Sequence, residues 1–473
     1  FFNTLSVQSF NKAATAAQLD TPCTTRREPS ADRPARKKVG VRVDVGNSIC
    51  GLFCCGGADW IGQSLSLSLP SHMSSGGSRS IRVSAPGKIL LFGEHAVVYG
   101  KKAVAASLNL RTECIIHVDD DTSLAPKRTV TLEFSHVKRT CDWVDILALL
   151  STSESGVYAE VNVQEVTPFC SLCEEEALLK LAGGDGSLRV TYSFLCAFAL
   201  LYRQMHGDFG MPSLVLDVKT ELPIGAGLGS SASFCVCLAT AFLTAFGCLD
   251  PFENGSEVEL EERPVWRPDS PDLEVINKWA FEAEKILHGN PSGVDNTVAT
   301  FGGALIFSHT MTLMLESTFP DLRFLITHTK VPRNTGTLVA GVRTRREQYS
   351  NVIDSLLCAI NHISDKCHVL LTDPSLQQGK VEAAFEDLID INHHILNALG
   401  VGHPTLDRVC TISSEYGLHS KLTGAGGGGC AITLIPAGIP PEKLNELRDS
   451  LEQEGFSVFD ASVGSVGVVL ERL

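Results

Sequence analysis

The segment 221–232, with the sequence ELPIGAGLGSSA, has the composition of an anion-binding loop. Glycines alternate with apolar residues over 225–229, and two serines, Ser230 and Ser231, lead into an apolar run that we expect to be helical. Glycines let backbone N–H groups approach an oxygen atom without an intervening Cβ, and a helix N-terminus adds unpaired donors and its dipole. We therefore predict a cradle for phosphate groups; the alternative is a tight helix entry with serine as its N-cap.

A second glycine-rich segment, 421–430 with the sequence KLTGAGGGGC, leads into the apolar run 431–435. It contains Gly-x-Gly-x-x-Gly, but we expect a strand after it rather than the helix that a dinucleotide-binding motif requires. The first loop departs from that motif because Ser230 replaces the third glycine, and from a Walker A loop because no Gly-Lys-Ser/Thr follows. The many glycines predict that another group approaches the backbone of 421–430 closely; a flexible turn is the alternative.

Two carboxylates flank a turn-rich loop that suits a metal or general-base site. The apolar stripe over 272–287 predicts a helix with Glu284 in its last turn, where a carboxylate opposes the helix dipole unless a cation pairs with it. The loop 288–296, HGNPSGVDN, can return Asp295 toward Glu284. One carboxylate would suit Mg²⁺ and the other a base or a lysine partner, although either could be a solvated surface acid.

Lys88 and the charged pair Glu94-His95 stand out in an otherwise apolar stretch. We expect a strand over 81–84 that ends at Pro86-Gly87, so that Lys88 lies just beyond a tight turn. A surface lysine and a structural histidine are the alternatives when this segment is taken alone.

These motifs lie in a chain that alternates short apolar strands with longer helical stretches, as α/β and α+β folds do. No internal repeat is evident. A new strand near residue 324 suggests a domain boundary close to 320. The expected strands are 81–84, 104–114, 130–134, 214–218 and 324–327, and the expected helices are 192–206 and 272–287.

Composition excludes several classes of protein. With 473 residues, 44% hydrophobic and 20% charged, the chain is not disordered over its whole length, and a net charge of −15 argues against a general nucleic-acid or anionic-membrane surface. The 16 cysteines lie scattered in apolar runs, which is typical of free core cysteines in a reducing compartment. Residues 231–249 carry no charge, but their Ser, Thr, Cys and Gly content and the absence of a basic flank favour a buried helix over a membrane span.

The first 72 residues differ from the rest of the chain. They carry a net charge of +3 against −18 for the remainder, show no sustained helical or strand period, and precede the first methionine, Met73. A mitochondrial transit peptide fits poorly, because the stretch contains five acidic residues and no amphipathic Arg-rich helix. We expect translation to start at Met73 and residues 1–72 to be an unstructured or artefactual extension.

Together, the Pro-Gly-Lys entry, the Pro-x-Gly-x-Gly-x-Gly-Ser-Ser loop and the Lys-x-Thr-Gly-x-Gly-Gly-Gly-Gly run resemble the GHMP small-molecule kinases, and among them the mevalonate kinases of animals. The resemblance runs from about 80 to 469 and includes the segments 94–100, 107–112, 288–296, 330–335 and 399–403. It implies an α+β chain with a ribosomal-S5-like, ATP-binding N-terminal domain, 73–319, and a ferredoxin-like C-terminal domain, 320–473, with the active site between them. It also implies ATP-dependent phosphorylation of the C5 hydroxyl of mevalonate, in isoprenoid and sterol precursor biosynthesis.

The resemblance assigns roles to individual residues. Asp295 matches the catalytic base, and Lys88 matches a residue that pairs with this base and with the reacting oxygen. Ser231 and Glu284 match ligands of Mg²⁺. The other matched positions are ATP contacts at Lys88, Thr220, Gly225, Ala226, Gly227, Leu228, Gly229, Ser230 and Ser231, and substrate contacts at Glu94, His95, Thr335 and Ala425. An asparagine that contacts the nucleotide in related enzymes has no counterpart near Phe134-Ser135, so the adenine pocket stays unassigned.

The resemblance further implies a cytoplasmic homodimer that is inhibited by downstream isoprenoid diphosphates and has neither a nucleic-acid nor a membrane partner. The C-terminal Glu471-Arg472-Leu473 is only distantly similar to Ser-Lys-Leu, so a peroxisomal pool stays open. Two alternative functions remain: another GHMP kinase acting on galactose, homoserine or phosphomevalonate, and a GHMP-fold sensor that binds ATP without turnover. The presence of Lys88, Glu284 and Asp295 argues against the sensor.

Overall fold

The computed structural model describes residues 78–119, 129–134, 137–150, 163, 172–206, 211–249, 270–308, 311–315 and 320–473. The elements below all belong to one compact unit, Ser68–Leu473. The extension predicted for residues 1–72 lies outside the described residues.

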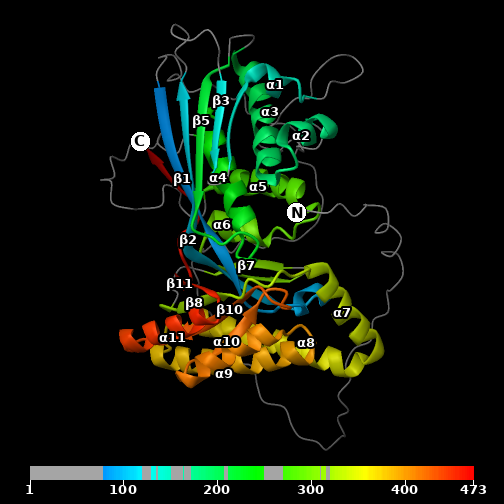
Figure 1. The fold of residues 1–473 in the computed structure, drawn as a ribbon, viewed down its shortest axis with the longest axis vertical. Helices are drawn as coiled ribbons and strands as arrows, with labels where there is room; N and C mark the ends of the chain where they lie inside the picture. Colours follow the sequence, from blue (N-terminus) through cyan, green and yellow to red (C-terminus); the bar gives the residue numbers. More distant parts are fainter. Residues whose placement is uncertain are drawn as a thin grey trace, which may run out of the picture. The chain divides into compact units, whose positions relative to one another are not determined.

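An eight-stranded mixed sheet forms the first half of this unit (Figure 1). Its strands follow the order β12 (Val469–Arg472), β1 (Ser78–Phe92), β2 (Ala103–Asp119), β5 (Ser213–Thr220), β3 (Thr129–Phe134) and β4 (Val137–Asp142), and β2 also pairs with β6 (Ala304–Ser308), which pairs with β7 (Met311–Leu315). Neighbouring strands are antiparallel except for β3 and β5, which are parallel. The last strand of the chain, β12, therefore returns to pair with β1.

Helices cover this sheet, and the central one is almost wholly buried. They are the α-helices α1 (Trp143–Leu147), α2 (Glu175–Ala182), α3 (Gly186–His206), α4 (Ser230–Ala245), α5 (Pro271–His288) and α6 (Val294–Phe301). The short 3₁₀ helix η2 (Ala96–Tyr99) instead contacts α8 (Ser350–Thr372). Helix α4 packs on β1 and β2 and against α5 (Figure 1). Its Phe242 stacks on Phe198 of α3 with ring centroids 4.9 Å apart. The buried helix predicted after the glycine-rich loop is thus confirmed, and none of the helices in the described ranges combines the length and apolarity needed to cross a bilayer.

A smaller antiparallel sheet forms the second half of the unit. Its order is β11 (Ser457–Ser462), β8 (Arg323–His328), β10 (Cys430–Ile435) and β9 (Ser420–Thr423). Its helices are α7 (Thr335–Gln348), α8 (Ser350–Thr372), α9 (Gln378–Ala398), α10 (Pro404–Glu415) and α11 (Pro441–Gln453). Figure 1 shows α8 to α11 beneath the sheet and α7 at its side. The βαββαβ succession with this strand order is ferredoxin-like, as expected.

The two sheets share a hydrophobic core along the second half of β1. Ile89 and Phe92 of β1 pack in one cluster with Phe324 of β8 and Phe385 of α9, and the Phe92 and Phe385 ring centroids lie 5.8 Å apart. Burial of such aromatic side chains stabilises each half by contact with the other. The division into domains at residue 320 stays a prediction.

One expected strand boundary is wrong. Strand β1 does not end at Pro86-Gly87 but continues to Phe92, with an irregular register between Pro86 and Lys88. Pro86, which has no N–H to donate, lies at the start of this irregularity. Gly87 is needed there, because a Cβ at this position would lie 2.4 Å from a methyl group of Leu222. Lys88 therefore belongs to the strand and does not follow a turn.

The cysteines in the described ranges are free, as predicted, and most are buried. Cys237 of α4 illustrates their role: its thiol donates to the Thr112 carbonyl over 3.2 Å, and burial raises its pKa to about 12. These thiols therefore behave as small core residues.

Candidate active site

Strand β1 carries Lys88 between the first glycine-rich loop and the helix α6. The Lys88 backbone N–H donates to the Leu228 carbonyl over 2.9 Å, which anchors the loop on the strand. Its Nζ lies 3.1 Å from Asp295 Oδ1, with 15% of the lysine side chain and 34% of the aspartate side chain exposed. The structure thus joins two residues that lie more than 200 positions apart and that the sequence analysis singled out.

The loop over 225–229 has the alternating geometry expected of a cradle. Gly225, Gly227 and Gly229 all have positive φ, from 73° to 82°, a region that favours glycine. Ala226 and Leu228 point into the core and are 1% exposed, so the loop is held from below by apolar contacts. Helix α4 begins directly afterwards at Ser230, and its first turn faces the loop with unpaired N–H donors.

The position of Gly229 is set by the lysine. A Cβ at Gly229 would lie 2.8 Å from Lys88 Cγ, whereas a Cβ at Gly225 would meet nothing within 4 Å. Thr220, a predicted ATP contact at the end of β5, uses its hydroxyl within the protein: Oγ1 lies 3.0 Å from Thr112 Oγ1 and accepts from the Leu222 N–H over 3.1 Å.

Glu284 and Asp295 are brought together, as the turn-rich loop predicts. Glu284 lies near the end of α5 and is 4% exposed, while Asp295 occupies the first turn of α6, where a helix N-terminus favours a carboxylate. Burial raises the pKa of Glu284 above its usual value, and the nearby Asp295 carboxylate acts in the same direction. The Ser231 hydroxyl hydrogen-bonds to Glu284 and opposes this shift.

His288 completes this group and was missed as a site residue. Its Nε2 lies 3.0 Å from Ser231 Oγ and 3.9 Å from Glu284 Oε2. The signal was present, because positions 284 and 288 are four apart on one helix and therefore face the same side. We expected a cation beside Glu284, and the structure places the His288 imidazole at that position.

Ser231 and Glu284 fit a magnesium ion better than a metal held by protein alone. Within the described part of the chain, no three His, Cys, Asp or Glu side chains are grouped to hold a metal. Mg²⁺ is usually bound through one or two protein oxygens, with phosphate oxygens and water completing its shell. The buried Glu284 carboxylate, which lies beside the Ser231 hydroxyl, the Cys235 thiol at 3.7 Å and the His288 imidazole at 3.9 Å, suits that arrangement.

Glu94 and His95 follow the end of β1 and contact the C-terminal half. His95 has φ 58°, a left-handed conformation that is costly for a residue with a Cβ, and its Nε2 lies 2.8 Å from the Ala425 carbonyl oxygen. Burial lowers the pKa of His95. Glu94 is 1% exposed, and its carboxylate pairs with Lys421 and Asn392. Two predicted substrate contacts, His95 and Ala425, therefore meet directly.

Arg333 joins the two glycine-rich segments, and the sequence analysis named it only within the segment 330–335. Its Nη2 donates to the Ala226 carbonyl over 2.9 Å, and its Nη1 lies 3.5 Å from the Thr423 carbonyl oxygen. A Cβ at Gly227 would lie 1.9 Å from Nη2, and one at Gly429 2.3 Å from Nη1. Thr335, a predicted substrate contact, is exposed at the start of α7, two residues beyond this guanidinium.

The close approach predicted for 421–430 is made by the protein itself. Besides Arg333 at Gly429, the Val401 carbonyl oxygen would lie 2.1 Å from a Cβ at Gly426, and Val331 2.7 Å from one at Gly428. The glycines therefore let two segments of the C-terminal half, 331–333 and the one at Val401, pack against one strand entry.

The comparison with known proteins gives the family. The model of the GHMP kinases N terminal domain matches residues 193–303, and that of the GHMP kinases C terminal domain matches 380–457. Mouse mevalonate kinase is 42% identical over 398 residues, covering 83% of this chain and 95% of the mouse protein, and the human enzyme is 42% identical over 400 residues with the same coverage. This chain belongs to the mevalonate kinase family. The resemblance to GHMP kinases is thereby confirmed.

Solved structures agree with this kinase fold. The crystal structure of Methanococcus jannaschii mevalonate kinase matches with a TM-score of 0.55 at 21% identity, over 81% of this chain and 98% of that one. A crystal structure of L. major mevalonate kinase in complex with R-mevalonate matches with a TM-score of 0.55 at 20% identity, over 81% and 96%. At these identities the matches show the fold.

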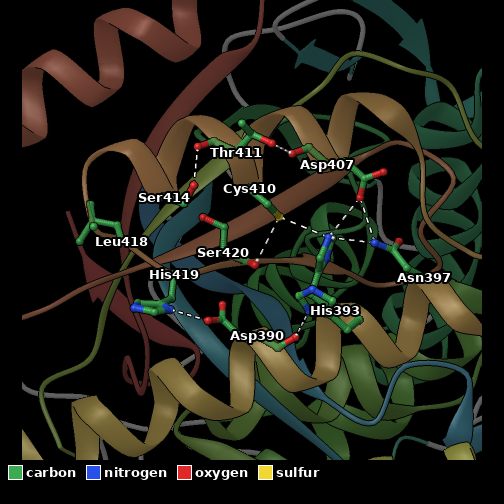
Figure 2. A pocket seen from close by; sticks show the side chains of 12 residues that line it. Asp390, His393, Asn397, Asp407, Cys410, Thr411, Ser414, Leu418, His419 and Ser420 are labelled. Atoms are coloured by element: carbon green, nitrogen blue, oxygen red, sulfur yellow. Dashed lines mark hydrogen bonds and ion pairs between the residues drawn. The ribbon is translucent and has the colours of Figure 1, made fainter.

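A surface pocket of about 430 Å³ lies elsewhere in the kinase, between α9, α10 and the segment 417–420. Figure 2 shows Asp390 paired with His419, and His393 facing Asp407 and Cys410. The distances are 2.7 Å from His419 Nδ1 to Asp390 Oδ2 and 3.2 Å from His393 Nε2 to Asp407 Oδ1. None of the predicted site residues lines this pocket, so it is separate from the candidate active site.

Two glycine substitutions test the cradle. Both Gly229→Ala and Gly225→Ala place a Cβ at positive φ, at a cost of roughly 1–2 kcal/mol each. Only Gly229→Ala also displaces Lys88, so we expect it to lower turnover about a hundredfold, as a displacement near 1 Å can. Steady-state kinetics with thermal denaturation of both variants is the measurement. Equal losses of turnover in the two variants would contradict the anchoring of Lys88 by this loop.

Proposed function

We propose that this kinase transfers the γ-phosphoryl group of ATP to the C5 hydroxyl of mevalonate, giving 5-phosphomevalonate and ADP. The observation that carries the proposal is the 42% identity to mouse and human mevalonate kinases over 95% of their lengths. The Lys88–Asp295 pair beside a glycine cradle supports it chemically.

Phosphoryl transfer needs positioning and charge neutralisation more than covalent help from the protein. The chain's net charge of −15 would repel ATP, so the phosphate site must be built locally. Backbone N–H groups over 225–229, the first turn of α4 with Ser230 and Ser231, and the Lys88 ammonium supply this. Thr220 is proposed as a further nucleotide contact.

Asp295 is proposed as the base that accepts the proton of the C5 hydroxyl. A primary alcohol is a poor nucleophile at neutral pH, so a carboxylate that takes its proton late in the transfer assists the reaction. Lys88, 3.1 Å away, forms an ion pair with that carboxylate and can also contact the reacting oxygen.

Mg²⁺ is proposed to be held by Ser231 and Glu284. When bound, it would neutralise charge on the transferring phosphoryl group. Glu284 must be ionised for this role; burial raises its pKa, and the neighbouring His288 and the hydrogen bond from Ser231 oppose that shift. His288, in contact with Ser231, holds the two oxygen donors near each other.

Glu94, His95, Thr335 and Ala425 are proposed to form the mevalonate end of the site. Substrate choice depends on such pocket side chains, so other GHMP substrates are the alternatives: galactose, homoserine or phosphomevalonate. The match to a Lactococcus lactis galactokinase complexed with galactose has a TM-score of 0.51 at 17% identity, which concerns the fold alone.

We further propose, from the family resemblance, that the kinase is a homodimer that acts in isoprenoid and sterol precursor biosynthesis. We propose a cytoplasmic location, with a peroxisomal pool as the alternative, and inhibition by downstream isoprenoid diphosphates. Light scattering coupled to size-exclusion chromatography measures the assembly, and inhibition assays with isoprenoid diphosphates measure the feedback.

The substrate proposal is tested by ADP release in a coupled assay. We expect ADP release with mevalonate, and a value of kcat/KM for galactose, homoserine or phosphomevalonate lower by about 10⁴ or more, since sites that hydrogen-bond one substrate reject others by that order. A higher kcat/KM for any of the other three would overturn the substrate assignment. ATP binding without ADP release in the presence of any of these alcohols would favour the sensor.

Asp295→Ala tests the base. We expect kcat to fall by about 10²–10⁴, the usual contribution of a general base, while nucleotide affinity changes little. Asp390→Ala, which removes a carboxylate from the separate surface pocket, is the control and is expected to keep normal turnover. Near-normal turnover in Asp295→Ala would refute the assignment.

Ser231→Ala and Glu284→Gln test the metal ligands. Each is expected to raise the Mg²⁺ concentration needed for half-maximal activity about tenfold or more, because each removes an oxygen donor. Binding of Mn²⁺ in the presence of nucleotide, followed by electron paramagnetic resonance, gives a readout besides turnover. An unchanged metal titration would remove that residue from the ligand set.

A further inference from the structure

A charged pair with no solvent exposure lies directly behind the proposed mevalonate end. Lys421 Nζ, from β9, forms an ion pair with Glu94 Oε1, and both side chains are 0% exposed. The Lys421 ammonium also lies 5.4 Å from the centre of the Phe92 ring. Burial lowers the pKa of Lys421, and Glu94 opposes that shift. The positive charge of Lys421 therefore depends on Glu94.

Asn392, from α9, hydrogen-bonds to the second oxygen of the Glu94 carboxylate. Its Nδ2 donates to Glu94 Oε2 over 3.1 Å, and the residue is 0% exposed. Its neighbour His393 points the other way, into the surface pocket of Figure 2. Both Glu94 oxygens are therefore engaged by residues of the C-terminal half.

The segment 421–425 also contacts the chain on both sides of Glu94. Thr423 Oγ1 donates to the Leu90 carbonyl over 2.8 Å, and the Ala425 carbonyl meets His95 Nε2 at 2.8 Å. Between these contacts, His95 has its costly φ of 58°. A strained conformation persists only when its surroundings over-determine it.

We propose that Lys421 and Asn392 are positioning residues for mevalonate binding, which act by fixing the Glu94 carboxylate and, through it, the conformation of His95. Glu94, proposed as part of the mevalonate end, then shapes that end without contacting a substrate atom, because Lys421 and Asn392 engage both of its oxygens. This inference rests on the proposed function and deepens it, because it separates the residue that faces the substrate from the residues behind it.

The physical argument is one of specificity rather than stability. Removing two charges from water costs about as much as their attraction returns, so a buried ion pair is weak evidence for stability. A fully satisfied buried polar group does select one arrangement of the segments that carry it. Here those segments are the residues just after β1, the start of β9 and the C-terminal part of α9, which Glu94, Lys421 and Asn392 hold together.

The experiment compares Asn392→Leu with Glu382→Gln. Glu382 is a buried acid on the same helix; its Oε1 accepts from Gln378 Nε2 over 2.8 Å and from the Ala437 N–H over 3.0 Å, at the far end of α9 from Glu94. Both variants disturb buried hydrogen bonding on α9: Asn392→Leu removes an amide donor, and Glu382→Gln replaces one carboxylate oxygen by a donor. Thermal unfolding measures the structural cost of each. Steady-state kinetics then measures KM separately for mevalonate and for ATP.

We expect Asn392→Leu to raise KM for mevalonate by about tenfold or more and to leave KM for ATP within about twofold, whereas Glu382→Gln leaves both within about twofold. Lys421→Met would leave a buried unpaired carboxylate and unfold the protein, so the double variant Glu94→Gln/Lys421→Met is used instead. We expect it to fold and to show the same selective rise in KM for mevalonate.

Three results would overturn the proposal. They are an unchanged KM for mevalonate in Asn392→Leu, an equal rise in KM for both substrates, and wild-type kinetics in the double variant. Failure of the proposed function is a different observation, made on the wild-type chain: no ADP release with mevalonate. In that case KM of Asn392→Leu and Glu382→Gln is measured for the alcohol that the kinase accepts.

Discussion

Lys88 can reach Asp295 because strand β1 passes through Pro86-Gly87 without ending there. The irregular register at this point accommodates the proline, and the absence of a Cβ at Gly87 leaves room for Leu222. The strand then anchors the phosphate cradle through the Lys88 N–H and the Leu228 carbonyl. One backbone path thus fixes the cradle, the lysine and, through the lysine, the proposed base.

The remaining elements hold this path in place from two sides. Helix α4, buried against β1 and β2, presents its N-terminus to the cradle, and α5 and α6 bring Glu284 and Asp295 to the same point. From the C-terminal half, Arg333 ties the cradle to the second glycine-rich segment, and Lys421 ties β9 to the segment after β1. In an acidic chain, a phosphate site of this kind depends on local groups, here the glycine backbone and the Lys88 ammonium, rather than on net charge.

Local patterns predicted much of this site. The alternating glycines, the helix before Glu284 and the return of Asp295 follow from glycine chemistry and helical period, and the structure brings them together. Lys421 and Asn392 could not be found that way, because their partner Glu94 lies about 300 residues distant and no periodicity links them. The end expected for β1 was wrong because proline is excluded from most positions inside a strand. Here Pro86 lies at an irregularity of the register, where a strand can contain it. Arg333 escaped notice because its contacts are to backbone oxygens, which carry no sequence signal.

The central claim is that the Lys88–Asp295 pair receives the C5 hydroxyl of mevalonate beside the cradle. A crystal structure of this kinase with mevalonate and a non-hydrolysable ATP analogue tests it most directly. We predict the C5 oxygen within hydrogen-bond distance of both the Asp295 carboxylate and Lys88 Nζ, facing a terminal phosphate held by residues 225–231. A C5 hydroxyl turned away from Asp295, with the substrate carboxylate on Lys88, would contradict the account.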